Sequence, residues 1–401
     1  MTLTIDDVEA AQRRLEGRIR LTPCTSAPLL GKLTGRSVVC KREQLQITGS
    51  FKERGAANRL LMLSPSERRR GVIAASAGNH ALGLSYHGRE LGVPVTVVMP
   101  ERAPLVKVEQ CRAYGARVVL HGDGFDDAKT HARALSENEG LTFVHSFDDV
   151  HVIAGQGTLG LELLDQASSL DALLVPVGGG GLLAGLEVVL AAKNPSLQLI
   201  AVEAEHAPTL TAALAAGHPR RIVTEPSLAD GLSVAEMGAL SFEVLQKRAP
   251  RVVRVSEAAI ATAIVRLMEL EKTIVEGAGA VGLAALLEHP EAIPEERVGL
   301  VLSGGNIDLS TVSRIIERGL AAQGRLCRLA VELDDHPGSL AALTRLIART
   351  GANVQQIDHD RNFGPADVSL VTVRLVLQTR DHAHVGQIEA ALDAEGLRWS
   401  R

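Results

Sequence analysis

The chain has 401 residues, of which 46% are hydrophobic and only 2% aromatic, and its formal net charge is −5. This length predicts two or three domains with aliphatic cores, and the negative charge without a basic stripe argues against a nucleic-acid-binding protein. The four cysteines are far apart, and neither an apolar leader nor a long apolar run occurs, so we expect a cytoplasmic protein without disulfides, a zinc site or a membrane span.

The first informative segment follows an expected strand over residues 38–41 and centres on Lys52. Ser50 and Glu53 match a capping box, which predicts a helix that begins at Phe51 with Lys52 in its first turn. The helix dipole and nearby apolar surface disfavour an ammonium there, and a readily deprotonated lysine can form a Schiff base with a carbonyl cofactor. Taken alone, these residues are also compatible with a surface lysine on an ordinary helix.

Strands and helices then alternate regularly. This order predicts right-handed βαβ units on parallel sheets, with a small lobe over about residues 50–147 and a larger lobe around it. Residues 154–159 (Ala-Gly-Gln-Gly-Thr-Leu) predict a turn that leads into a new helix. The expected strands are 72–75, 95–99, 117–120, 172–177, 198–202 and 298–302, and the expected helices include 6–19, 79–91, 104–114, 125–138, 256–271 and 309–322.

The pattern changes after residues 323–325, Gln-Gly-Arg, which we expect to link a domain of residues 1–322 to a tail of residues 326–401. The tail has the order β-α-β-β-α with room for a short last strand, which predicts a ferredoxin-like βαββαβ unit. It contains no lysine and no cluster typical of catalysis. A regulatory or assembly role is therefore expected for it.

Four consecutive glycines, Gly178, Gly179, Gly180 and Gly181, stand between a predicted buried strand and a predicted helix. Consecutive glycines let backbone N–H groups converge on an anion, and the helix start adds its dipole, so a phosphate is the expected ligand. The sequence matches neither a P-loop nor the dinucleotide fingerprint. A permissive tight turn is the alternative.

Two further loops follow predicted strands. Residues 76–80, Ser-Ala-Gly-Asn-His, offer N–H groups and a hydroxyl to a carboxylate, although His80 alone is as well explained by packing. Ser303 could hydrogen-bond a pyridine nitrogen without protonating it. All these loops fall at the carboxyl ends of strands, where open α/β sheets bind ligands.

Five motifs occur in order along the chain: Ser-Phe-Lys at 50–52, Ser-Ala-Gly-Asn-His at 76–80, the glycines at 178–181, Val-Glu-Gly-Ala-Gly at 275–279 and Ser-Gly-Gly-Asn at 303–306. Together they resemble the fold-type II enzymes of pyridoxal 5′-phosphate (PLP) and, within them, the threonine dehydratases. The tail, with Asp-His-Pro-Gly-Ser-Leu at residues 335–340, resembles an ACT domain, a module that commonly binds amino acids at interfaces.

The resemblance implies a role for each matching position. Lys52 would hold PLP as a Schiff base and shuttle the substrate's α-proton. The remaining implied roles are ring packing by Phe51, a bond from Asn79 to the ring hydroxyl, phosphate binding by Gly178, Gly179, Gly180, Gly181 and Leu182, a contact of Ser303 with the pyridine nitrogen, and carboxylate binding by Ser76, Gly78, Asn79 and His80.

The implied reaction is β-elimination, which turns L-threonine into 2-oxobutyrate and ammonia and L-serine into pyruvate. The alternatives are a PLP lyase that prefers L-serine or 3-hydroxyaspartate, and an inactive amino-acid-sensing protein. Serine racemases carry a second catalytic serine where this chain has Ala77, so we expect elimination without efficient racemisation. Such relatives often bind a divalent metal near a Glu and an Asp; Glu203 matches the first, but Thr209 replaces the second, and we expect no metal.

For the tail, the hypothesis is that a branched-chain amino acid binds at a subunit interface and lowers activity. Its ligands would be His336, Gly338, Ser339 and Asn353. The alternative is a purely structural tail that mediates assembly. The expected partners are thus an amino-acid substrate, an amino-acid effector and further copies of the chain in a dimer or tetramer, with no nucleic acid and no membrane.

Overall fold

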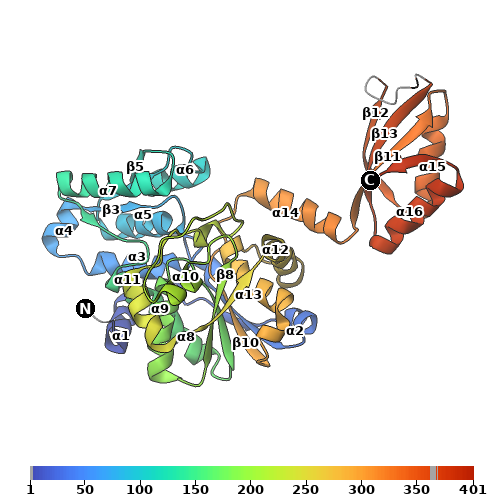
Figure 1. Cartoon of the computed structure of the whole chain (residues 1–401). Coiled ribbons are helices and arrows are strands. Elements are labelled where there is room, and N and C mark those ends of the chain that lie inside the picture. The colour runs from blue at the N-terminus through green and yellow to red at the C-terminus, as the bar shows by residue number, and fades with distance from the viewer. Residues whose placement is uncertain (1–2, 362–366, 368) are drawn as a thin grey trace. The chain divides into compact units, whose positions relative to one another are not determined.

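The computed structural model describes residues 3–361, 367 and 369–401 and divides into two compact units, 1–307 and 308–401 (Figure 1). Helix α14 (Leu309–Ala322) is grouped with the second unit, where the carbonyl oxygen of Ala322 lies 3.0 Å from Nε2 of His382. Within the described residues, no helix is long and apolar enough to cross a membrane. The division into a catalytic and a regulatory domain stays a prediction.

The first unit contains the predicted small lobe, a four-stranded parallel sheet in the order β5-β4-β3-β6. Successive side chains of a strand point to opposite faces. Ile73 and Ala75 therefore pack on α7 (Phe125–Glu139), while Val72 and Ala74 face the core that includes α3, α5 and α6. The strands are β3 (Val72–Ala75), β4 (Val95–Met99), β5 (Arg117–Leu120) and β6 (Thr142–Phe143), and the other helices are α3 (Lys52–Leu61), α4 (Pro65–Arg70), α5 (Asn79–Leu91) and α6 (Leu105–Ala113).

The large lobe is a six-stranded sheet in the order β1-β2-β10-β7-β8-β9, parallel except for β1. Leu173 and Val175 of β7 share a core with α8 and α9, whereas Leu174 faces α13. The two sheets with helices on both faces confirm the predicted α/β fold. The strands are β1 (Cys24–Ser26), β2 (Ser37–Arg42), β7 (Ala172–Pro176), β8 (Gln198–Ala204), β9 (Arg251–Val255) and β10 (Arg297–Leu302), and the helices are α1 (Ile5–Leu15), α2 (Pro28–Thr34), α8 (Val150–Gln166), α9 (Gly181–Lys193), α10 (Thr209–Ala216), α11 (Ala239–Leu245), α12 (Glu257–Glu271) and α13 (Gly277–Glu288).

The predicted turn at residues 154–159 is wrong, because this segment lies inside helix α8. Its glycines serve close helix packing instead. A Cβ on Gly155 would lie 2.5 Å from the carbonyl oxygen of Arg54, and one on Gly157 would lie 2.9 Å from that of Gly185. Glycine is required here by the approach of α3 and α9 to α8.

The second unit holds an antiparallel sheet in the order β12-β13-β11-β14, as the ferredoxin-like pattern predicts. One face of the sheet packs on two helices through an aliphatic core that includes Leu329, Val331, Leu343 and Ile388. The elements are β11 (Leu326–Asp334), α15 (Ser339–Thr350), β12 (Asn353–Asp360), β13 (Leu370–Gln378), α16 (His382–Ala394) and β14 (Arg398–Ser400).

Candidate active site

The segment before Lys52 runs antiparallel to the segment after β10. Phe51 N–H donates to Ser303 O at 3.0 Å, and Gly305 N–H donates to Gly49 O at 2.9 Å. These bonds place Ser303 beside the start of α3, where Lys52 is the first helical residue. Two strands far apart in sequence, β2 and β10, thus deliver Lys52 and Ser303 to one place.

The predicted capping box at Ser50 does not form. The Glu53 carboxylate accepts the N–H of Thr48 instead, and the buried Ser50 hydroxyl has no hydrogen-bond partner among the described residues. Ser50 forms an antiparallel bridge with Gly304, and the N-cap residue of the helix is Phe51, without a side-chain cap. Lys52 nonetheless lies in the first turn of a helix, as predicted.

Lys52 is half-buried, and its Nζ donates to Ser146 O at 3.0 Å. Burial lowers the pKa of Lys52 to about 8, although the charge of Glu276 partly opposes this. The Nζ atom also lies 5.3 Å from the centroid of the Phe51 ring. An amine with this pKa is partly unprotonated near neutral pH, which a nucleophile or base requires.

The glycine loop follows β7 and opens α9. A Cβ at Gly179 would overlap the ring of Phe147, and Gly180 has a left-handed φ of 87°. Two carbonyls of the loop are fixed by protein donors: Gly178 O accepts from Thr209 Oγ1 at 2.9 Å, and Gly179 O accepts from Gly238 N–H at 3.1 Å. The N–H groups at the start of α9 have no carbonyl partner within the helix and are donors for an anion.

Asn79 belongs to a polar network that joins the two lobes. Its Nδ2 donates to Glu276 Oε1 at 2.7 Å, and its Oδ1 accepts from Asn306 Nδ2 at 2.9 Å. The Glu276 N–H in turn donates to Gly304 O at 3.0 Å. The network brings Asn79 to the same edge of the site as Ser303.

Glu276 is a candidate functional residue that reasoning from the sequence did not single out. Burial raises its pKa to about 7, and the charge of Asp230 adds to the rise, while Lys107 opposes it. The only signal in the sequence was its place in the motif at residues 275–279. A buried carboxyl that titrates near neutral pH is a frequent feature of active sites.

Residues 76–80, predicted to bind the substrate carboxylate, follow β3 and include the first two residues of α5. Gly78 N–H donates to Ser76 Oγ at 3.3 Å, which closes a tight turn before Asn79. His80 is buried, and burial lowers its pKa to about 3, with further lowering by Lys52 and His145. His80 is therefore neutral near neutral pH and does not repel the charged form of the Lys52 amine.

The segment 145–148 connects the lysine to the glycine loop. Ser146 O accepts from Lys52 Nζ, while the next residue, Phe147, packs its ring on Gly179. Leu182, in the first turn of α9, is buried. The structure thus assembles the predicted cofactor residues of both lobes around one place.

The predicted effector residues are not brought together within one chain. Ser339 Oγ lies 3.0 Å from His336 Nδ1 in the loop after β11. Asn353 instead pairs with Gln378, which in turn pairs with Leu326 at the start of β11. Asn353 and the loop with His336, Gly338 and Ser339 thus lie at opposite ends of the sheet.

The residues present fit PLP. A lysine whose pKa is lowered by burial lies in the site, and the glycine loop, where a Cβ at any of the four positions would overlap neighbouring protein atoms, lies at a helix start. Amide and carboxyl groups form the polar edge between them. The lysine amine can condense with the aldehyde of PLP, and the glycine loop can bind its phosphate. The amide and carboxyl groups can bind the polar substituents of its ring.

Glu203 is already satisfied by the protein. Its carboxylate accepts from Leu210 N–H at 2.5 Å and from Thr211 Oγ1 at 2.6 Å, and burial raises its pKa. Thr209 directs its hydroxyl to Gly178 rather than to Glu203. Among the described residues, no group of three or more His, Cys, Asp or Glu side chains is arranged for a metal ion.

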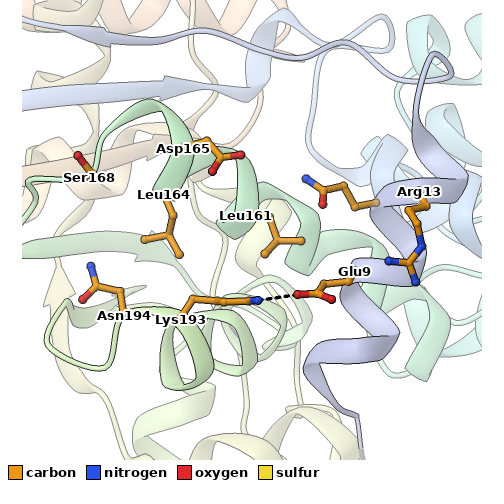
Figure 2. A pocket seen from close by; sticks show the side chains of 9 residues that line it. Glu9, Arg13, Leu161, Leu164, Asp165, Ser168, Lys193 and Asn194 are labelled. Carbon is orange, nitrogen blue, oxygen red and sulfur yellow. Dashed lines mark ion pairs between the residues drawn. The ribbon is translucent and has the colours of Figure 1, made fainter.

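A pocket of about 470 Å³ lies away from these residues, between α1, α8 and the end of α9. Figure 2 shows Lys193 reaching across it toward Glu9, with 2.7 Å between Nζ and Oε1. The hydrogen bond from Lys193 lowers the pKa of Glu9. Both acidic and basic side chains line the pocket, and the Lys193–Glu9 ion pair joins α1 to α9 across it. None of the predicted site residues line it.

Comparison with known proteins agrees with this geometry. A family profile described as "Pyridoxal-phosphate dependent enzyme" matches residues 15–304. The chain is 42% identical over 394 residues to the L-threonine ammonia-lyase of Thermotoga maritima, with 98% of each chain covered. Among solved structures, a threonine deaminase from T.th. is similar at a TM-score of 0.72 and 42% identity, covering 76% of this chain and 99% of that one. The serine racemase of Dictyostelium discoideum gives a TM-score of 0.72 and 36% identity over 77% of this chain and all (100%) of that one.

Proposed function

The chain belongs to the pyridoxal-phosphate dependent enzyme family, and we propose that it deaminates L-threonine within this family. It eliminates the β-hydroxyl of L-threonine as water, and hydrolysis of the resulting enamine then takes up one water and releases 2-oxobutyrate and ammonia. The named activities of the relatives from Thermotoga maritima and T.th. support this assignment. L-Serine is a second substrate of the same chemistry, because it differs only by a methyl group at the carbon that loses the hydroxyl.

PLP, when bound, supplies an aldehyde that condenses with amines and a ring that spreads the negative charge left by loss of an α-proton. The glycine loop binds the phosphate through N–H groups at the start of α9. Ser303 and Asn79 bind the polar edge of the ring, and Phe51 packs against it. Ser76, Gly78, Asn79 and His80 hold the substrate carboxylate at the end of β3.

Lys52 holds the cofactor and moves the α-proton. Its amine is suited to both tasks because burial lowers its pKa to about 8, so that both protonation states are accessible near neutral pH. The neutral His80 does not compete as an acid. Ala77 leaves the other side of the substrate without a hydroxyl that could return the proton with inverted configuration, which favours elimination over racemisation.

The observation that carries the proposal is the convergence of Lys52, Ser303 and the glycine loop, fixed by backbone hydrogen bonds and by the contact of Phe147 with Gly179. The test is keto-acid release from L-threonine and L-serine by the purified protein, beside the Lys52→Ala variant. We expect rapid release of 2-oxobutyrate, and a loss of at least about a thousandfold in the variant. Bound PLP without product from either amino acid would overturn the substrate and direct the search to 3-hydroxyaspartate.

We further propose that the tail is an ACT domain and regulates the enzyme. The βαββαβ order of the second unit supports this, as does the His336–Ser339 contact in the loop after β11. Because Asn353 lies at the other end of the sheet, a site that uses both groups combines two copies of the chain. A homo-oligomer, a branched-chain amino-acid effector and a cytoplasmic location complete the proposal.

A further inference from the structure

Ser241 carries a buried hydroxyl that the proposed reaction does not yet use. The residue is fully buried in helix α11, and its Oγ has no hydrogen-bond partner among the described residues. A serine in the middle of a helix can donate to the carbonyl four residues earlier, as Ser85 does to Ala81 O at 2.7 Å, but Ser241 is only the third residue of α11 and has no such carbonyl within its helix. An unsatisfied buried hydroxyl is unfavourable, so its position calls for a ligand.

The hydroxyl lies beside the glycine loop. A Cβ built on Gly180 would lie 2.9 Å from Ser241 Cβ and 3.5 Å from Ser241 Oγ. Gly180 is the residue immediately before α9 and has the left-handed φ of the loop. Ser241 therefore packs against the turn that leads into the start of α9, where the phosphate is proposed to bind.

The segment immediately before Ser241 is fixed by two backbone N–H groups. Gly238 N–H donates to Gly179 O at 3.1 Å, and Leu240 N–H donates to Asp148 Oδ1 at 2.9 Å. Asp148 follows Phe147, which packs on Gly179. The start of α11, the glycine loop and segment 145–148 thus form one connected unit around the proposed phosphate position.

We propose that Ser241 Oγ donates a hydrogen bond to the PLP phosphate and is a side-chain ligand that supplements the backbone of the glycine loop. This inference rests on the proposed cofactor site at residues 178–181. The loop itself offers only N–H donors, and no lysine or arginine belongs to it. A hydroxyl that donates to a phosphate oxygen would add a charge-assisted hydrogen bond and would relieve the unsatisfied group.

The experiment compares the affinity for PLP with that for pyridoxal, which lacks the phosphate. Holoenzyme of the wild type, Ser241→Ala, Ser241→Cys and Ser241→Thr is freed of cofactor and titrated with each compound by absorbance. We expect Ser241→Ala to bind PLP about tenfold to a hundredfold more weakly, with unchanged affinity for pyridoxal. Ser241→Thr should retain most of the affinity, because it keeps the hydroxyl.

The matched control is Ser85→Ala, which also removes a buried serine hydroxyl from a helix but lies in α5. It should bind PLP like the wild type. An equal ratio of PLP to pyridoxal affinity in Ser241→Ala and in the wild type would overturn the inference and leave the proposed function intact. If Ser241→Ala does not fold, the same comparison with Ser241→Cys decides. A wild type that fails to bind PLP would instead overturn the proposed function.

Discussion

Asn79 and Glu276 are joined by a hydrogen bond of 2.7 Å although 197 positions separate them in the sequence. Asn79 begins α5 in the small lobe, and Glu276 precedes α13 in the large lobe. The bond therefore crosses between lobes at the polar edge of the site. Burial raises the pKa of Glu276 to about 7. The position of the Asn79 side chain therefore depends on whether Glu276 is protonated.

This raised pKa makes the stability of the cofactor-free protein depend on pH. Between about pH 4.5, the ordinary pKa, and about pH 7, the folded protein holds a proton on Glu276 that the unfolded chain has released. Stability from this group is thus fully present at low pH and falls as pH rises toward 7. Urea unfolding should show that Glu276→Gln loses this slope, with a difference from the wild type of up to about 3 kcal/mol.

A methyl group in the glycine loop tests whether this loop binds the PLP phosphate. Gly179→Ala places a methyl group where the Phe147 ring lies, so the ring or the loop must move. We expect the affinity for PLP to fall by at least about tenfold, measured by the absorbance of the bound cofactor. Gly386→Ala is the control, because a Cβ there meets nothing within 4 Å. Equal PLP affinity in both variants would show that the phosphate binds elsewhere.

A buried cluster of charges anchors the helix that carries Lys52. Arg54 is fully buried and donates to both oxygens of Glu43 at 2.8 Å and to both oxygens of Glu162 at 2.7 Å. Burial alone would raise the pKa of Glu43, but the charge and hydrogen bonds of Arg54 lower it. Lys41 adds a second cation on Glu162 at 2.6 Å.

Arg54→Met leaves two buried carboxylates with one fewer cation. We expect a loss of about 3–5 kcal/mol in the free energy of unfolding, measured in urea, and a parallel fall in keto-acid release because α3 loses its anchor. Arg117→Met removes a cation from an exposed pair with Glu139 and should change stability by less than about 1 kcal/mol. A similar small effect for both variants would contradict the anchoring role.

The sequence predicted the α/β fold because hydrophobic strands and helices alternate, and it predicted the lysine and glycine loops because their residue types match specific chemistry. It could not predict helix packing. Gly155 resembled a turn residue, whereas its lack of a side chain serves the approach of α3. It also could not reveal that Glu53 turns to Thr48 N–H rather than capping with Ser50, or that Glu276 becomes buried beside Asn79. These features depend on contacts between segments distant in the chain.

The presence of Ala77 instead of a serine leads us to expect elimination without inversion of the configuration at the substrate's α-carbon. With L-serine, the wild type should form pyruvate with no appreciable D-serine, as followed by chiral chromatography. Ala77→Ser introduces a hydroxyl into the loop between Ser76 and Gly78, and D-serine formation should rise at least about tenfold, since a positioned acid or base contributes on the order of a hundredfold or more. Appreciable D-serine from the wild type would refute the assignment of elimination alone.

The last prediction concerns the tail, where strand register separates the two halves of the proposed effector site. Because β11 spans nine residues, Asn353 lies roughly 25–30 Å from the loop with His336 and Ser339, which is too far for one amino acid to bridge. A two-fold symmetric pair of copies can bring His336 of one copy to Asn353 of the other. Isoleucine or valine should then lower keto-acid release, and His336→Ala or Asn353→Ala should each abolish the response.

Mixing the two variants distinguishes a shared site from a site within one chain. In a mixed pair, one of the two sites contains an intact His336 and an intact Asn353, so part of the inhibition should return after the subunits exchange. A site built within each chain would stay defective in every mixture, because each chain lacks one group. If neither isoleucine nor valine changes the activity or the melting temperature of the wild type, the tail has no such effector, and its role in assembly becomes the better explanation.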